Sequence, residues 1–470
     1  MVEPNILIIS DLHLGEDVKP YSVRHLRHLA RLERELEDFL DHYTRARDDD
    51  RPWRLIVNGD MVDFMSVCLL PSAEEDSRAE ERRFGLGTGP LETKRKLEMV
   101  VQRHPGVFRK LARFVAAGNQ LVIILGNHDV EFHWAVVQDT FKEALYRFAC
   151  EDGELARPEI EARISFHPWF YCERDLLYVE HGHQYDDYCS FDYILNPEAP
   201  RREDGILLSI GHAAIRYFVN LIPDMDPHGQ EEWTLLGYLR WALGQGLRGL
   251  VRLIYYYCLM IWRLLGLWRE LRERALDLKR RQEHFARLKQ LAERYQIDEQ
   301  TLLRLEALKR PMVLRDFFAL IQMLFLDRFA LGVLWLGATV VSLVEAPGLW
   351  KPVLPLLWTA GALMGNQLLS RRRDLDPAKK LARVPQAIRQ IVKTPYVVFG
   401  HSHDPVAQPL EDGAWYFNTG TWVPAERPGL LHAFTHLLIR RTGEGARAEL
   451  CQWRNGGSAL YQMPAPASPR

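Results

Sequence analysis

The sequence predicts an α/β fold that is interrupted by a large all-helical insertion. Short apolar runs, such as residues 121–125, stop at glycine and polar residues, as buried parallel strands do. Charged stretches with leucines at helical spacing separate these runs, which indicates amphipathic helices between the strands. Between residues 205 and 392, leucine, arginine and tryptophan dominate and no strand-like alternation remains. We therefore expect a helical insertion there, which a domain tolerates where the flanking ends lie close together on its surface.

The composition is that of a mostly soluble protein with apolar insertions. A chain of 470 residues can form two or three domains. Its 62 acidic and 60 basic residues nearly balance, so no global charge favours a nucleic-acid partner. The six cysteines form no CxxC motif, which indicates a reduced, cytosolic setting. The first apolar run lacks a basic segment before it and is expected to be a strand, not a signal peptide.

The first two predicted strands each lead into polar residues. Residues 5–10 lead into Asp11-Leu12-His13, and residues 53–57 lead into Asn58-Gly59-Asp60. The charged stretch between them, to about residue 49, is predicted to be an amphipathic helix. Its regularly spaced leucines are Leu26, Leu29, Leu32, Leu36 and Leu40.

The third strand follows a loop and a long helix. Residues 71–90 are polar and glycine-rich, which favours a mobile loop beside the site. A helix is expected over about 93–117, and the strand after it ends in Gly126-Asn127-His128-Asp129. In open α/β sheets ligands bind at the carboxyl ends of the strands, so these polar residues are candidates for a functional site.

Histidines end two later strands. Residues 164–171 and 176–180 are predicted to be two strands joined by a polar turn, and the second leads into His181-Gly182-His183. Far along the chain, residues 396–399 lead into Gly400-His401-Ser402-His403-Asp404. The pattern of an apolar run followed by metal-type ligands therefore recurs after the insertion.

The end of the chain completes the predicted domain organisation. Residues 415–420 repeat the strand-to-glycine pattern, two short strands are expected near 431–440 and 447–453, and a Pro/Ala/Ser segment closes the chain. The predicted division is a catalytic domain in two parts, 1–204 and 393–455, the helical insertion 205–392, and a disordered tail 456–470.

The polar strand ends together supply a set of metal ligands. Carboxylate, amide oxygen and imidazole suit divalent cations, and Asp-x-His and His-x-His place two side chains on the same side of an extended segment. The seven candidate ligands are Asp11, His13, Asp60, Asn127, His181, His401 and His403. Seven ligands are too many for one ion, so we expect two ions that share Asp60. Such a pair suits phosphoester hydrolysis because it polarises the phosphoryl group and activates a bridging water.

Four neighbouring residues are candidates for supporting roles. His128 is adjacent to a ligand and is expected to contact the phosphate or to protonate the leaving oxygen. Asp63 and Asp129 are candidates to orient ligand histidines. His183 follows a ligand in a glycine turn and is a candidate to line the phosphate pocket.

These blocks resemble the calcineurin-like metallophosphoesterases in content and in order, over about residues 1–200 and 393–455. The resemblance implies a four-layer αββα sandwich and a centre of two divalent ions, manganese, iron or zinc. It implies that His128 is the catalytic histidine. It assigns Asp11, His13, Asp60 and His403 to one ion and Asp60, Asn127, His181 and His401 to the other. The layout is also similar to UDP-2,3-diacylglucosamine hydrolases, which have arginine in place of His128 and lack an insertion of this size.

The insertion contains segments with membrane-like composition. Residues 329–344 and 352–370 carry no charge, and a spanning helix needs about 20 apolar residues. Arginines at Arg328 and 371–373 flank the pair, so the positive-inside rule predicts a hairpin with both ends in the cytosol. Residues 235–269 have the pattern of a basic interfacial helix. Residues 270–310 are predicted to form a solvated helical hairpin or a coiled coil, and buried soluble helices remain the alternative for the apolar runs.

The sequence thus favours a dinuclear metal-dependent phosphohydrolase at the inner face of the cytoplasmic membrane, with a phosphorylated substrate that is lipid-linked or membrane-proximal. A cytosolic nucleotide phosphodiesterase with the insertion as a cap is the second hypothesis. An inactive metal-binding scaffold is the third, although no ligand is missing. The residues leave open the substrate, the metal, the monoester or diester preference and the oligomeric state.

Overall fold

The computed structural model describes most of the chain. The described residues are 3–19, 27–72, 74, 77–151, 153, 156–201, 205–222, 241–242, 244–371, 376–423, 433–443 and 445–462. Several residues that enter the sequence-based predictions lie outside them, namely Leu26, residues 235–240, Arg372, Arg373 and residues 463–470.

The first sheet has seven strands. They are β1 Asn5–Ile9, β2 Trp53–Asn58, β3 Gln120–Ile124, β4 Ile164–His167, β10 Thr435–Thr442, β11 Gly445–Arg454 and β12 Gly457–Leu460. Their order is β12-β11-β10-β1-β2-β3-β4. β1 to β4 run parallel, and β10 pairs with β1 in antiparallel register, Leu7 opposite Leu438. The parallel part brings the carboxyl ends of β1, β2 and β3 to one edge.

The second sheet has five strands. They are β5 Phe170–Glu173, β6 Leu177–Glu180, β7 Tyr396–Phe399, β8 Val406–Pro409 and β9 Trp415–Asn418. Their order is β5-β6-β7-β9-β8, and β6, β7 and β9 run parallel. Because β6 and β7 are neighbours, the histidines that follow them in the chain meet at the same edge, although more than 200 residues separate them.

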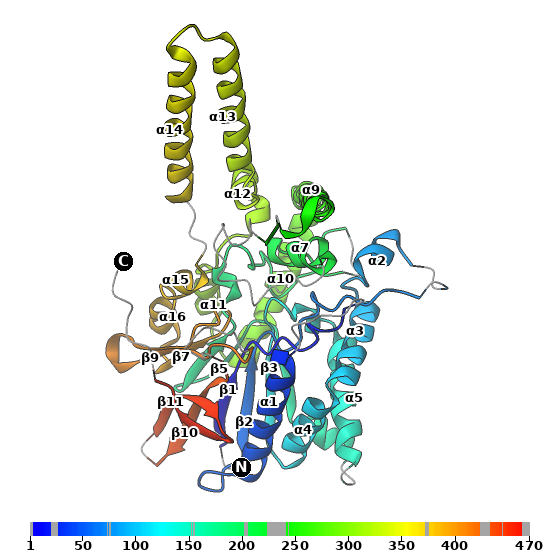
Figure 1. Ribbon diagram of the computed structural model, residues 1–470. Helices are drawn as coiled ribbons and strands as arrows, with labels where there is room; N and C mark the ends of the chain where they lie inside the picture. Colours follow the sequence, from blue (N-terminus) through cyan, green and yellow to red (C-terminus); the bar gives the residue numbers. More distant parts are fainter. Residues whose placement is uncertain are drawn as a thin grey trace.

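Strand alternation explains how the two sheets stack. In β1, Ile6 and Ile8 face the second sheet, where they pack with Val179 and Val398, whereas Leu7 points to the helices on the other side. The helices on that outer face are α1 Arg27–Arg45, α3 Pro90–Arg103, α4 Pro105–Ala116 and α5 Ala135–Glu151. The second sheet is covered by α10 Arg274–Tyr295, α11 Glu299–Glu306 and α16 Pro385–Val392. The predicted four-layer αββα sandwich is confirmed (Figure 1).

Several predicted elements have different boundaries. The single helix expected over 93–117 is two helices, α3 and α4, because Pro105 starts a new helix after His104. The strand expected over 164–171 is two strands in different sheets, β4 and β5, and the chain crosses between the sheets at Pro168.

Two segments expected to be irregular contain regular structure. Within residues 71–90 the chain forms α2, Ala79–Phe84, and buries Phe84. The strand β12 lies within the segment 456–470 that was expected to be disordered, because Asn455 and Gly456 adopt positive φ and turn the chain back onto β11. The expectation of irregular chain was wrong for residues 79–84 and 457–460.

Some helices of the insertion pack against the second sheet and so belong to the catalytic domain. Residues 270–310 were expected to be solvated or to form a coiled coil, but α10 and α11 bury Leu288, Leu291 and Leu302 against the second sheet. Before them come α7, Ile210–Tyr217, and α9, Gly246–Leu271. The short helix α15, Pro377–Leu381, returns the chain to the domain. The described residues between 205 and 392 are helical, as predicted. They are not a separate insertion throughout, because α10, α11 and α16 form one of the four layers of the sandwich.

The rest of the insertion projects from the domain. α12 is Phe317–Met323, and α13, Leu326–Glu345, and α14, Trp350–Arg371, form a hairpin that extends away from both sheets (Figure 1). Hydrogen bonds join its two helices, from Trp335 Nε1 to Thr359 Oγ1 at 3.0 Å and from Trp358 Nε1 to Ser342 Oγ at 3.0 Å. Leu334 and Leu356 are each 70% exposed. The hairpin therefore presents apolar side chains that nothing in the described chain covers.

Two of the described helices, α9 and α13, are long and apolar enough to cross a membrane by length and composition. Only 17% and 6%, respectively, of their most apolar windows are buried within the protein. A core helix of a soluble protein would be mostly buried, so neither helix has that character.

Candidate metal centre

The strand ends of both sheets deliver the candidate ligands to one edge of the sandwich. Asp11 follows β1, Asp60 follows β2 and Asn127 follows β3, whereas His181 follows β6 and the pair His401 and His403 follows β7. Asp11, His13, Asp60 and His181 are at most 1% exposed. The site is therefore assembled from the ends of five strands, which only the complete fold brings together.

Five of the seven candidate ligands adopt left-handed backbone conformations. The φ angles are 56° at Asp11, 47° at His13, 53° at Asp60, 67° at His401 and 59° at His403. Such conformations cost about 1–3 kcal/mol each in residues other than glycine and persist where the surrounding structure imposes them, typically at functional sites. The backbone thus holds these side chains at a cost in stability.

The first group of donors comprises Asp11, His13, Asp60 and His403. His403 Nε2 lies 3.2 Å from Asp11 Oδ1 and 3.4 Å from His13 Nε2. His13 Nε2 lies 3.9 Å from Asp60 Oδ2. Two ligands of one ion with bonds of about 2.1 Å lie about 3.0–3.4 Å apart. The two distances from His403 fall in this range, whereas the 3.9 Å between His13 and Asp60 lies above it. A metal ion between Asp11, His13 and His403 would therefore bind the two imidazole nitrogens that face each other.

The second group is centred on His181. Its Nε2 lies 3.1 Å from Asp60 Oδ2 and 3.2 Å from Asn127 Oδ1, and its Nδ1 donates to the carbonyl of Asn58 at 2.8 Å. The carbonyl therefore fixes the ring with Nε2 directed at the other donors. The His401 ring centroid lies 5.3 Å from that of His181. Because His401 Nε2 is paired with Asp186 Oδ2 at 3.2 Å, Nδ1 is the atom that remains for a metal.

Glycines at two strand ends allow this close approach. A Cβ at Gly126 would lie 2.1 Å from Asp60 Oδ1, and a Cβ at Gly59 would lie 2.3 Å from His181 Nδ1. Gly59 also has a φ of 82°, which disfavours other residues. Any side chain at these positions would displace Asp60 or His181.

His128 and Asp63 lie next to each other beside the first group. His128 Nδ1 lies 3.0 Å from Asp63 Oδ1, and Asp63 Oδ2 lies 3.7 Å from His13 Nδ1. Ser66 donates to both oxygens of Asp63, from N at 2.8 Å and from Oγ at 2.6 Å. One fixed carboxylate therefore faces a candidate ligand and the candidate catalytic histidine, and its orienting role stays a prediction.

Asp129 bonds the backbone at two strand ends, whereas His183 is buried beside His181. Asp129 was expected to orient a ligand histidine, but its carboxylate accepts hydrogen bonds from the backbone N–H groups of Met61 and Gly126, each at 2.7 Å. It thereby ties the ends of β2 and β3 together. His183 is 2% exposed, bonded to Gln184 at 2.9 Å and 5.4 Å from the His181 ring, so it lies behind a candidate ligand.

The charges of the site are mutually stabilising. Burial would raise the pKa of Asp60, but His181 and His128 hold this pKa well below its usual value. Burial likewise opposes ionisation of Asp11, and His403 lowers the pKa of that carboxyl. Burial would lower the pKa of His181, but Asp60 raises it to about 9. Both carboxylates are therefore ionised at neutral pH, as metal ligands must be.

Sequence reasoning missed three residues at this edge. His212 of α7 is 1% exposed, and its ring lies 6.1 Å from that of His128. Asp186 pairs with His401, and Lys380 of α15 pairs with Asp186 at 2.9 Å. Asp186 lies three residues beyond the His181-Gly182-His183 motif, which could have drawn attention to it. His212 and Lys380 belong to the insertion and carry no recognisable motif.

The donor set fits divalent metal ions. Donor atoms within 4.8 Å of one another include the groups Asp11–His13–His403 and Asp11–Asp60–His181. Carboxylates, one amide oxygen and imidazoles match the preferences of manganese, iron and zinc.

Comparison with known families agrees with this geometry. Residues 4–233 match the model of the calcineurin-like phosphoesterase family, whose members are metal-dependent hydrolases. His401 and His403 lie beyond the matched segment, and the fold returns them to it. No curated protein shows significant similarity to the chain. The predicted family and enzyme class are confirmed.

Proposed function

We propose that the enzyme is a dinuclear phosphoesterase that hydrolyses a phosphate ester or pyrophosphate on a lipid-linked or membrane-proximal substrate. The observation that carries the proposal is the position of Asp60 between the two donor groups, 3.9 Å from His13 Nε2 and 3.1 Å from His181 Nε2. Asp60 would bridge the ions. Asp11, His13 and His403 complete one set of ligands, and Asn127, His181 and His401 complete the other.

The proposed chemistry divides between the ions and the side chains. Two bound divalent ions would polarise the phosphoryl group and lower the pKa of a water molecule towards neutrality. His128 Nδ1 faces Asp63 Oδ1 at 3.0 Å, which leaves Nε2 for the substrate. From there His128 contacts a phosphoryl oxygen or gives a proton to the leaving oxygen. Asp63 holds the ring in place, because Ser66 fixes both of its oxygens.

The proposed location is the inner face of a membrane, with the hairpin of α13 and α14 inserted and the catalytic domain in the cytoplasm. Three observations support it. The hairpin exposes apolar residues along its length, and its polar side chains bond across the helix pair, as in membrane bundles. Arg328, at the base, bonds Ser370 of the other helix at 2.7 Å. Both ends of the hairpin connect to the catalytic domain (Figure 1).

Metal content and turnover test the catalytic part. Protein purified in detergent is expected to hold two divalent ions per chain and to hydrolyse an aryl phosphodiester. Asp60→Asn should lose metal and turnover together, whereas His128→Ala should keep the metal and lose turnover, with circular dichroism unchanged in both. Undiminished turnover in both variants would contradict the assigned roles.

A fractionation and a substrate panel test the membrane part. After a carbonate wash the protein is expected in the membrane fraction, and removal of residues 326–371 should release it. Lipid-linked phosphates should be hydrolysed faster than nucleotides in the presence of manganese. Recovery of the whole chain in the supernatant together with a preference for nucleotides would instead support a soluble phosphodiesterase with a helical cap.

A further inference from the structure

The helix α9 carries an apolar face that is turned away from the domain. Its large exposed side chains are between 50% and 79% exposed, and they are Leu247, Val251, Ile254, Tyr255 and Trp262. At about 3.6 residues per turn these side chains fall within about 100° of the helical wheel, so they form one continuous stripe. Cys258 is exposed in the middle of the stripe. We call this stripe the outer face of α9.

The opposite side of α9 is packed on the domain. Met260, Leu264 and Leu271 are at most 5% exposed and share an apolar cluster with Tyr217 of α7 and Leu320 of α12. In the chain α12 comes directly before the hairpin of α13 and α14. The helix α9 is therefore fixed to the domain at the base of the hairpin.

The helix α9 runs across the hairpin, not along it. In Figure 1, α9 is seen along its axis at the level of α12, whereas α13 and α14 are seen from the side. The helix α7 lies beneath α9, on the side away from the tip of the hairpin. With the hairpin inserted in a membrane as proposed above, the membrane plane lies across the hairpin. The helix α9 is then parallel to this plane, with its outer face towards the lipid.

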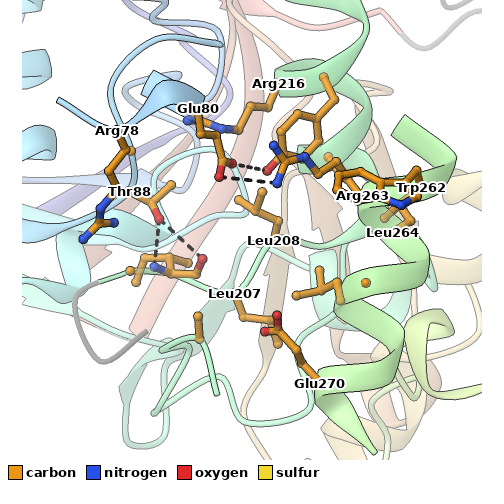
Figure 2. Close-up of a pocket in the computed structure, with 18 of the residues that line it drawn as sticks. Arg78, Glu80, Thr88, Leu207, Leu208, Arg216, Trp262, Arg263, Leu264 and Glu270 are labelled. Carbon is orange, nitrogen blue, oxygen red and sulfur yellow. Dashed lines mark hydrogen bonds and ion pairs between the residues drawn. The ribbon is translucent and has the colours of Figure 1, made fainter. Parts of the chain in front are cut away.

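Arginines line one edge of the outer face. Arg248 and Arg252 are exposed and come after Tyr255 on the helical wheel. In the described part of the chain, no acidic side chain forms an ion pair with either of them. Arg263, about three turns further along the same edge, lines the cavity of about 440 Å³ beneath α9 and pairs with Glu80 at 3.6 Å (Figure 2). The positive charge beneath α9 is thus compensated by the domain, whereas the charge beside its outer face is left for a partner.

The pattern of the outer face fits a lipid surface. An apolar stripe with aromatic residues and a basic edge is typical of a helix that lies in a membrane interface. The helix α9 contains four arginines and a single acidic residue, Glu270 in its last turn. Anionic headgroups complement this charge, whereas a second copy of the same face would bring like charges together. The cytoplasmic leaflet carries anionic lipids, and it is the leaflet that the proposed orientation presents to α9.

We propose that the outer face of α9 docks on the anionic lipid surface of the membrane, beside the inserted hairpin. The inference rests on the membrane location proposed above and adds a second contact, which fixes the orientation of the catalytic domain. Only α7 lies between α9 and the candidate catalytic histidine, since the ring of His212 on α7 is 6.1 Å from that of His128. Docking of α9 therefore holds the metal centre on the side of the domain that faces the lipid headgroups.

Native cysteines allow the contact to be measured on the full-length protein in lipid vesicles. Cys258 on the outer face and Cys150, in the last turn of α5, are both exposed. Cys150→Ser leaves Cys258 as the exposed site for a bimane label, and Cys258→Ser leaves Cys150 as the matched control. With lipids brominated in the acyl chain near the headgroup, the label on Cys258 should lose fluorescence and the label on Cys150 should not. Equal fluorescence of the Cys258 label in brominated and ordinary lipids would overturn the proposal.

Two vesicle compositions test the charge of the lipid surface. Quenching of the Cys258 label should be stronger in phosphatidylcholine mixed with phosphatidylglycerol than in phosphatidylcholine alone. Arg248→Gln together with Arg252→Gln should abolish this difference, because each arginine near an anionic surface strengthens binding about fivefold. Equal quenching in both compositions for the protein that retains both arginines would contradict an anionic partner.

A charge within the stripe tests the apolar contact. Val251 is 59% exposed and about two turns from the label, so Val251→Glu leaves the fold intact and should remove the quenching at Cys258. Leu460→Glu is the matched control, because Leu460 is 64% exposed and lies on β12. The proposal fails if the two variants are quenched alike.

A label in the hairpin separates this inference from the proposed membrane location. A Cβ at Gly337 on α13 would meet no atom within 4 Å, so Gly337→Cys accepts the label when Cys150 and Cys258 are both replaced by serine. Quenching in the hairpin without quenching at Cys258 would overturn the docking of α9 and leave the hairpin location intact. Quenching at Cys258 alone would support the docking and refute the inserted hairpin. An unquenched Cys258 that a bismaleimide crosslinks to Cys258 of another chain would overturn the proposal and assign the outer face to a second copy.

Discussion

The buried ion pair between Lys380 and Asp186 gives a prediction that can be worked from distances. Lys380 is 3% and Asp186 4% exposed, with Nζ and Oδ1 2.9 Å apart, and Asp187 Oδ2 lies 3.4 Å from the same Nζ. At an effective dielectric constant of about 20, the attraction at this distance is about 6 kcal/mol, which largely offsets the desolvation of both groups. Removal of one partner leaves a buried charge uncompensated. Lys380→Met should therefore lower the free energy of unfolding by about 3–5 kcal/mol.

The neighbouring lysine provides the control. The side chain of Lys379 is 71% exposed and pairs with Asp376 at 3.1 Å on the same short helix. Exposed pairs contribute about 0.2–1 kcal/mol, so Lys379→Met should change stability by less than about 1 kcal/mol. Urea unfolding followed by fluorescence, with the same m value for all three proteins, measures the difference. Equal losses in the two variants, or a loss below about 1 kcal/mol in Lys380→Met, would refute the reasoning.

Two further predictions concern other polar clusters. Asp63→Asn should lower kcat by about 10–100-fold with the fold retained, because Asp63 faces both His128 and His13. Ser66→Ala is the control, since Ser66 only donates to Asp63. If Asp63→Asn loses no more kcat than Ser66→Ala, the orienting role is contradicted. His104 lies between Asp17 at 3.2 Å and Glu33 at 2.5 Å, and although burial opposes its charge, Asp17 and Glu33 raise the pKa of His104 above 6.5. The pKa of Asp17 is lowered, despite its burial, by His104 and by Arg103. The decrease in the free energy of unfolding caused by His104→Gln should therefore be largest between about pH 4 and pH 6.5. It should become smaller as the pH rises through the raised pKa of His104 in the folded protein. Unfolding curves recorded across this pH range measure the difference. A loss that is constant from pH 5 to pH 9 would contradict it.

The sequence indicated several candidate ligands of both groups, because these residues closely follow an apolar strand. Asp11, Asp60 and His181 could be found from the strand that precedes each of them, and the parallel order of β1, β2 and β3 then brought two of them to one edge. The same logic found His403 beyond the insertion. It failed where a contact depends on a distant element without a motif, as with Lys380, which reaches Asp186 across 194 positions.

Prediction from the sequence also failed where the chain changes sheet or packing within a uniform stretch. The apolar run 164–171 has no internal feature except Pro168, and periodicity alone could not show that the chain changes sheets there. Likewise, the charged composition of α10 suggested a solvated helix, because a single buried stripe is enough to dock it. Leu288, Leu291 and Ala292 form that stripe against the second sheet. Composition therefore described the surface of α10 correctly and its packing wrongly.

The position of the insertion has a consequence for how catalysis and membrane attachment are linked. α15 follows α14 after a short stretch of chain, and its Lys380 reaches the Asp186 that holds His401. Before the hairpin, α7 places His212 beside His128. The chain segment that returns from the proposed membrane hairpin thus ends beside the metal centre, at the ion pair of Lys380 and Asp186. This arrangement gives a physical reason for the chemistry and the apolar helices to belong to one folding unit.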